Sequence, residues 1–116
     1  MAVGDTIYKI CTAAEWREAD RIGWFRGSAV DLRDGFIHFS TAEQAAETAQ
    51  KHFSGQRDLV LVAVDAAALG AELKWEPSRG GALFPHLYGV LDVKAVRRVA
   101  PLPLDAEGRH VFPTLQ

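Results

Sequence analysis

The chain has 116 residues, of which 48% are hydrophobic and 24% are charged, and its formal net charge is −2. This length is that of one ordinary domain, and the balance of apolar and charged residues excludes a disordered chain. The weak net charge and the lack of a basic face argue against a nucleic-acid partner. We therefore expect a single domain over residues 1–116, with a core at about 6–100 and an irregular tail at 101–116.

The cysteine content and the apolar runs bear on the compartment. Cys11 is the only cysteine, so no internal disulfide can form, and a reducing, cytoplasmic location is expected. The longest apolar run, at 59–64, has the length of a strand and is too short to cross a bilayer. We expect no membrane partner, and the sequence leaves monomer and homodimer open.

The first quarter of the chain predicts a strand followed by a helix. Residues 7–10 are typical of a strand, and Thr12-Ala13-Ala14-Glu15 is a capping box that begins a helix. Gly23 is expected to end that helix. The segment 24–31 has no apolar period and is expected to be a loop with one short turn at most.

The rest of the chain predicts one more helix and several strands. Residues 36–39 are expected to form a strand, followed directly by the capping box Ser40-Thr41-Ala42-Glu43 and a helix with an alanine face. The run 58–64 is apolar on both faces, so it should lie in the centre of an antiparallel sheet. Further strands are expected at 72–76, 84–88 and 90–99.

The order of these elements indicates the fold class. Helices come early and strands late, whereas a parallel doubly wound sheet would alternate throughout, so α+β is expected. No G-x-G-x-x-G follows the first strand and no P-loop is present, so two common nucleotide-binding motifs are absent.

The strand at 36–39 carries the first group of candidate site residues. Alternation places His38 and Ser40 on the face opposite the core, at the start of the second helix. Thr41 lies beside them and Gln44 one turn later, where free amides favour an anion. The alternative is that Ser40 and Thr41 only cap the helix and that His38 is a structural residue.

A loop after the strand at 72–76 carries the second group. Glu76 is a candidate general base or acceptor of a ligand hydroxyl, and Arg79 can hold a phosphate or a carboxylate in a bidentate fork. Trp75 can stack on a ligand, and Ser78 is a further candidate contact. The alternative is a surface hairpin with a weak Glu–Arg ion pair.

The third group lies on the strand at 84–88. Alternation puts Phe84, His86 and Tyr88 on one face, which could form a platform for a planar ligand. The alternative is that the aromatic residues belong to the core, although a buried histidine needs a hydrogen-bond partner.

A metal site is the alternative to a metal-free cleft. His38, His86 and Glu76 have the residue types of a two-histidine, one-carboxylate site. Their spacing has no local signature such as H-E-x-x-H, so we expect no metal.

Four segments resemble those of a family of small bacterial proteins catalogued as domain of unknown function 952. The segments are Ile7-Tyr8-Lys9-Ile10, Asp34-Gly35-Phe36-Ile37-His38-Phe39-Ser40-Thr41, Lys74-Trp75-Glu76-Pro77-Ser78-Arg79 and Phe84-Pro85-His86-Leu87-Tyr88-Gly89. The resemblance covers roughly residues 7–99 and implies a fold similar to that of ADP-ribosyltransferases, with a split antiparallel half-barrel sheet and two helices.

The resemblance also bears on a cofactor. Residues 36–40 look like the strand end of RNA 2′-phosphotransferases, which share that fold and use NAD. Those enzymes carry a histidine followed by Gly-Thr on the first strand, and Lys9-Ile10 stands there in this chain. This difference argues against NAD as the cofactor, and the identity of any cofactor stays open.

The leading hypothesis is an ADP-ribosyltransferase-like cleft that binds a nucleotide or another phosphorylated small molecule. One alternative is a binding module without NAD chemistry, and another is a dimerising protein whose strand at 84–88 pairs with a partner. Any enzyme is expected to be a transferase with catalytic residues His38, Glu76 and His86. The candidate ligand-binding residues are Lys9, Ser40, Thr41, Gln44, Trp75, Ser78, Arg79 and Tyr88. We expect His38, Glu76, Arg79 and His86 to converge on one concavity.

Overall fold

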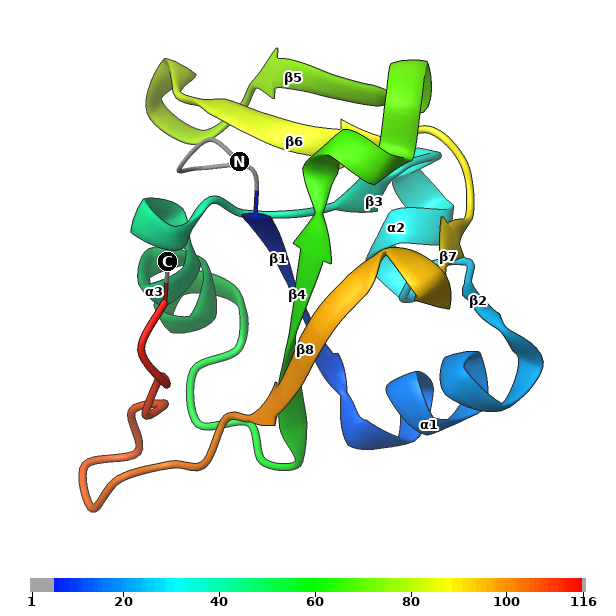
Figure 1. Ribbon diagram of the computed structural model, residues 1–116. Helices are drawn as coiled ribbons and strands as arrows, with labels where there is room; N and C mark the ends of the chain where they lie inside the picture. The colour runs from blue at the N-terminus through cyan, green and yellow to red at the C-terminus, as the bar shows by residue number, and fades with distance from the viewer. Residues whose placement is uncertain (1–5, 116) are drawn as a thin grey trace.

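A three-stranded antiparallel sheet forms the centre of the molecule. The computed structural model describes residues 6–115, without the side chain of Arg79. In it β4 (Leu59–Asp65) lies between β1 (Thr6–Thr12) and β8 (Val96–Pro101), as Figure 1 shows. Side chains on both faces of β4 are buried. The central position predicted for this strand is therefore confirmed.

Two smaller sheets complete the strand content of the described residues. In one, β6 (Leu83–Leu87) lies between β3 (Ile37–His38) and β5 (Leu73–Pro77), and in the other β2 (Trp24–Phe25) pairs with β7 (Leu91–Asp92). All pairings are antiparallel. The single split sheet expected from the sequence is therefore divided into three small sheets, because β2, β3 and β7 span only two residues each.

The segment 37–40 connects the two three-stranded sheets. At its start it pairs with β6, and the amide of Phe39 still donates to the carbonyl of Pro85 at 3.0 Å. One residue later Ser40 pairs with Tyr8 of β1 through two backbone hydrogen bonds of 2.8 Å. The chain therefore passes from one sheet to the other within these four residues.

Both edges of β6 are occupied within the chain. One edge bonds to β5 along its whole length, and the other bonds to β3 and to the amide of Phe39. The side-chain amide of Gln44 donates to the carbonyl of Leu83 at 2.8 Å on the remaining part. Among the described residues most of both edges of β6 is thus already engaged, and pairing of this strand with a partner chain stays a prediction.

The helix α1 (Ala13–Ile22) has the ends predicted from the sequence. The amide of Glu15 donates to the Thr12 hydroxyl at 3.0 Å, and the Thr12 amide donates to the Glu15 carboxylate at 2.8 Å. Gly23 ends the helix in the left-handed region, with φ of 101°.

A second helix lies where a loop was expected. α2 (Ala29–Asp34) follows β2, so the loop prediction for 24–31 is wrong. The helix begins at Ser28, whose amide donates to the Asp31 carboxylate at 2.8 Å. Asp31 is also its only buried residue, and a helix that buries an aspartate shows no apolar period.

The helix α3 (Ala42–His52) begins one residue later than expected. Thr41 is the N-cap, and its amide donates to the side chain of Gln44 at 3.0 Å. The box of Ser40 to Glu43 is therefore wrong by one position, because the backbone of Ser40 is engaged with β1. α3 lies beside β1 (Figure 1), and Ala49 of its alanine face belongs to the same buried cluster as Tyr8 and Ile10.

Short 3₁₀ turns interrupt the second half of the chain. They are η1 (Ala66–Glu72), η2 (Arg79–Gly81) and η3 (Val93–Ala95). The prediction of one continuous strand at 90–99 is wrong. The turn η3 interrupts it, because the Asp92 carboxylate accepts from the Lys94 amide at 2.9 Å and caps this turn.

The domain is of the α+β class with antiparallel sheets, as predicted. Leu102 is 2% exposed, so the core continues slightly into the tail. Among residues 6–115, no helix combines the length and the apolar character needed to cross a membrane.

Candidate functional site

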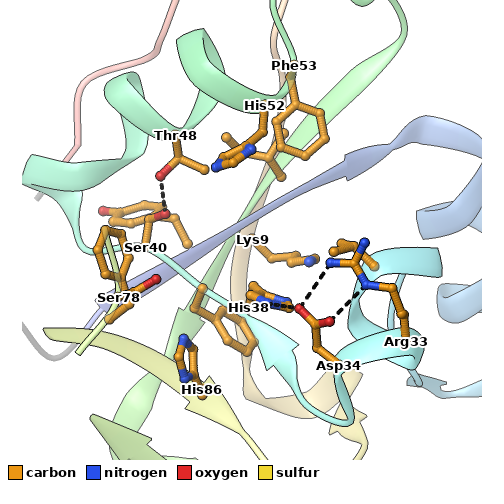
Figure 2. Close-up of a pocket in the computed structure, with 15 residues that line it drawn as sticks. Lys9, Arg33, Asp34, His38, Ser40, Thr48, His52, Phe53, Ser78 and His86 are labelled. Atoms are coloured by element: carbon orange, nitrogen blue, oxygen red, sulfur yellow. Dashed lines mark hydrogen bonds and ion pairs between the residues drawn. The ribbon is translucent and has the colours of Figure 1, made fainter. Parts of the chain in front are cut away.

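A pocket of about 430 Å³ opens beside the segment that connects the two sheets (Figure 2). Residues from β1, β3, β6, α2 and α3 line it. Its aromatic side chains are Tyr8, Phe39, Phe53 and Phe84. Its polar and charged side chains are Lys9, Arg33, Asp34, His38, Ser40, Thr48, His52, Ser78 and His86.

A buried aspartate organises one wall of this pocket. Asp31 is 1% exposed, and its Oδ2 accepts from the Lys9 ammonium at 2.7 Å and from the Ser28 amide at 2.8 Å. Its Oδ1 accepts from the His38 backbone amide at 3.1 Å and from the ring Nδ1 at 2.7 Å. One carboxylate therefore ties α2 to β1 and β3.

The environment of Asp31 keeps it ionised. Burial alone would raise its pKa, but the hydrogen bond from His38 and the charge of Lys9 outweigh this effect and hold the pKa at about 2. Lys9 is itself only 4% exposed, so the two residues form a buried ion pair. Removing one partner of such a pair leaves an uncompensated charge.

Gly27 allows the chain to pass close to Asp31. Its φ is 121°, a conformation that L side chains rarely adopt, and an added Cβ would lie 2.7 Å from the Asp31 Cβ. Both the backbone conformation and the close approach therefore require glycine here.

His38 has a carboxylate at each ring nitrogen. Asp31 accepts at Nδ1, and the Asp34 Oδ2 lies 3.0 Å from Nε2. The imidazolium form donates to both carboxylates, whereas a neutral ring can donate to only one. Asp34 also pairs with Arg33, whose hydrogen bond is the main cause of the lowered Asp34 pKa.

His86 is held by a separate carboxylate. The ring is buried, and Nδ1 lies 2.7 Å from the Glu76 Oε1, which also accepts from the Tyr88 hydroxyl at 2.7 Å. The hydrogen bond from His86, followed by that from Tyr88, lowers the pKa of Glu76. Glu76 is therefore ionised, and Nδ1 of His86 is the donor.

The second nitrogen of His86 makes no hydrogen bond among the described residues. No buried side-chain nitrogen or oxygen of these residues is left unsatisfied. His86 itself lines the pocket. A neutral ring with its proton on Nδ1 carries its lone pair on Nε2.

Phe36 packs behind the two histidines. Its ring centroid lies 4.5 Å from that of His38, 4.1 Å from that of His86 and 5.1 Å from that of Tyr88. The two histidine rings are 5.6 Å apart and nearly edge to face. The structure thus brings His38, Glu76 and His86 together, whereas the Arg79 side chain lies outside what it describes.

Three of the predicted ligand contacts take part in hydrogen bonds within the protein. Ser40 is buried in the pocket wall, and its hydroxyl lies 2.9 Å from that of Thr48. Thr41 and Gln44 form the cap of α3, and Gln44 also binds the carbonyl of Leu83. The alternative that Ser40 and Thr41 only cap the helix therefore describes Thr41, whereas Ser40 precedes the cap and binds Thr48.

The other predicted contacts divide between the pocket and its surroundings. Lys9 and Ser78 line the pocket. Trp75 and Tyr88 do not line it; Trp75 is 44% exposed, and Tyr88 bonds to Glu76 and packs against Phe36.

Several residues of the site were missed in the sequence. They are Asp31, Arg33, Asp34, Phe36, Thr48 and His52. Two signals were available: Ser28 and Asp31 have the spacing of a capping box, and Gln44, Thr48 and His52 recur every four residues along one helix face.

The described residues do not assemble a metal site. No three histidine, cysteine, aspartate or glutamate side chains among residues 6–115 are placed to hold a metal ion together. Glu76 and Asp31 instead bind the Nδ1 atoms of the two histidines.

The comparisons with known proteins give the family. The sequence model described as "Protein of unknown function (DUF952)" matches residues 10–99. The chain belongs to this family. A crystal structure of protein CC0527 from Caulobacter crescentus, 60% identical, superposes with a TM-score of 0.88 and covers 91% of this chain and 93% of that one.

Two further structures of protein CC0527 share the DUF952 fold described here. The crystal structure of a double mutant of that protein is 58% identical, covers 91% of this chain and 93% of that one, and has a TM-score of 0.88. The solution NMR structure is 61% identical, covers 90% of each chain and has a TM-score of 0.81. No curated protein matches this DUF952 chain.

Proposed function

We propose that this DUF952 protein binds a nucleotide or another phosphorylated small molecule in the pocket, in a cleft of ADP-ribosyltransferase type. In this proposal His86 exchanges a proton with the ligand. The observation that carries the proposal is that Lys9, Ser40 and His86, each nine-tenths or more buried, line one pocket, while the equally buried Asp31 binds Lys9 and His38 of its lining. We also infer a cytoplasmic setting, in keeping with the single free cysteine.

The burial of these groups argues for a site because a stable core does not need them. Taking charged groups out of water is costly, and replacing a buried ion pair by packed apolar residues is often neutral or stabilising. Here the buried pair of Lys9 and Asp31 lies at the wall of a pocket and orients His38. Polar groups that converge in an otherwise apolar concavity are typical of ligand sites.

The pocket lining supports a ligand with an anionic group and a ring. Arg33 and Lys9 supply positive charge, His38 supplies a ring N–H donor, and Phe39 and Phe84 supply aromatic surface. Ligand pockets in proteins span about 300–1,000 Å³. At about 430 Å³ this pocket is near the lower end of that range and suits a mononucleotide better than a dinucleotide.

The position of His86 supports a role in proton transfer. His86 lines the pocket, its Nε2 has no hydrogen-bond partner among the described residues, and Glu76 holds Nδ1 in the protonated form. A histidine oriented by a carboxylate can accept a proton from a ligand hydroxyl and return it to a leaving group. Glu76 and Tyr88 then act as positioning residues, since neither lines the pocket.

A binding module without NAD chemistry is the second candidate. Lys9 occupies the first-strand position that a histidine holds in the NAD-using enzymes, and its ammonium is engaged by Asp31. This engagement favours a ligand other than NAD. The passage of 37–40 from one sheet to the other remains in keeping with a split half-barrel.

A thermal-shift screen with NAD, ADP-ribose, AMP and inorganic phosphate tests the proposal. A ligand at one hundred times its Kd should stabilise the fold by about 2.7 kcal/mol, which raises the Tm of a domain of this size by about 10 °C. The rise should shrink in His86→Gln and persist in the matched variant His110→Gln, since His110 does not line this pocket. The proposal fails if no phosphorylated compound raises the Tm, or if the rise is the same in both variants.

A further inference from the structure

The Asp34 carboxylate is held by the side chains of Arg33 and His38 at the pocket wall. Its Oδ1 accepts from the Arg33 Nε at 2.9 Å, and its Oδ2 lies 3.0 Å from the His38 Nε2 and 3.4 Å from the Arg33 Nη2. Figure 2 shows Asp34 between these two side chains, with all three lining the pocket. The contacts are those by which proteins hold the carboxylate or phosphate of a ligand.

Local structure gives little reason for an acid at this position. Asp34 is the last residue of α2, where free carbonyl groups make a negative charge unfavourable. Among the described residues, its carboxylate contacts only Arg33 and His38. Asp31, by contrast, is buried and accepts two backbone amides as well as two side chains.

We propose that Asp34 stands in for the anionic group of the ligand. Arg33 and His38 form an oxyanion subsite, Asp34 occupies it while the pocket is empty, and a ligand carboxylate or phosphate takes its place. This inference rests on the proposed function, because it assigns a subsite within the same pocket.

The exchange requires little rearrangement. Asp34 is about one-third exposed and Arg33 about three-quarters exposed, so their ion pair is of the kind that contributes little to stability. His38 keeps its Nδ1 bond to the buried Asp31 and presents Nε2 to either partner. An incoming phosphate carries more charge than the carboxylate that it displaces.

Inorganic phosphate titrated into the full chain tests the subsite. Asp34→Asn keeps the shape of the side chain and removes the competing charge. The subsite of Arg33 and His38 should then be unoccupied in most molecules, so we expect this variant to bind phosphate about tenfold more tightly than the wild type. Glu18→Gln is the matched control, because it removes a carboxylate from an exposed Arg–Glu pair on α1 and should leave the affinity unchanged. Arg33→Gln added to Asp34→Asn should abolish the gain.

Histidine side-chain NMR on ¹⁵N-labelled protein locates the binding. Phosphate should shift the Nε2 signal of His38 and leave that of His110 in place. The inference is overturned if Asp34→Asn binds phosphate no more tightly than the wild type, or if the shifts occur away from His38. If AMP or ADP-ribose still stabilises the wild type in that case, the proposed function stands without this subsite; if neither protein binds any of these compounds, both proposals fail.

Discussion

The helices α1 and α2 begin and end alike but differ in what they bury. Each has an acidic residue at its third position that accepts from the N-cap amide, and each ends at a glycine with positive φ. α1 buries Trp16 and Ala19, whereas α2 buries only Asp31. The same local signals thus build a helix that supports the core in one place and a wall of a pocket in the other.

The two helices also differ in how many groups their capping carboxylates bind. Glu15 accepts from the Thr12 amide. Asp31 accepts from the equivalent amide of Ser28 and, in addition, from Lys9 and His38. Asp31 therefore serves the helix and the site together, and its removal should affect both.

The largest expected difference between the two helices is in the stability lost when the charge of the capping carboxylate is removed. Asp31→Asn leaves Lys9 buried without a counter-charge, so we expect a loss of about 3–5 kcal/mol in the free energy of unfolding. Glu15→Gln keeps a side chain that can complete the capping box, and it should cost less than about 1 kcal/mol. Urea unfolding followed by circular dichroism measures both, and equal losses would contradict the comparison.

The glycines next to the two helices offer a second matched pair. Gly27→Ala combines an unfavourable φ with a contact of 2.7 Å to Asp31, and it should cost about 3 kcal/mol. Gly23→Ala meets the unfavourable φ alone, because nothing lies near an added Cβ, and it should cost about 1–2 kcal/mol. Similar unfolding midpoints for the two variants would argue that Asp31 moves aside readily.

Low pH should reduce the free energy of unfolding, because Asp31 becomes protonated. Its pKa in the folded state is about 2, below the ordinary value of 3.8, so its ionised form contributes stability above about pH 4. That contribution is lost as the pH falls towards 2. The unfolding free energy of the wild type should therefore drop more between pH 4 and pH 2 than that of Asp31→Asn, and parallel pH profiles would count against the assignment.

The elements that the sequence predicted correctly depend on local signals. The box at Thr12, the stop at Gly23 and the apolar run of β4 each lie within a few residues and need no partner from elsewhere. Alternation also placed His38 and His86 on strand faces that meet in the structure. These predictions hold because helix caps and strand alternation are set by neighbouring residues.

The missed elements depend on contacts between distant segments. α2 buries an aspartate, which is favourable only because Lys9 from β1 and His38 from β3 reach it. The strand at 90–99 was divided because Asp92 caps a turn, an option that the apolar pattern does not show. The sequence named His38, His86 and the Glu76 carboxylate that binds His86, but not Asp31, which binds His38 and Lys9.

The most direct test of the account is a titration of ¹⁵N-histidine-labelled protein with AMP and ADP-ribose, observed at the histidine side chains. Binding in the proposed pocket should shift the Nε2 signals of His38 and His86 together and saturably, while His110 stays unchanged. The same titration of Asp31→Asn, at a temperature where it is folded, should show weaker binding because His38 loses its anchor. Saturable shifts confined to His110, or no shifts at millimolar ligand, would contradict the central claim that this pocket is the ligand site.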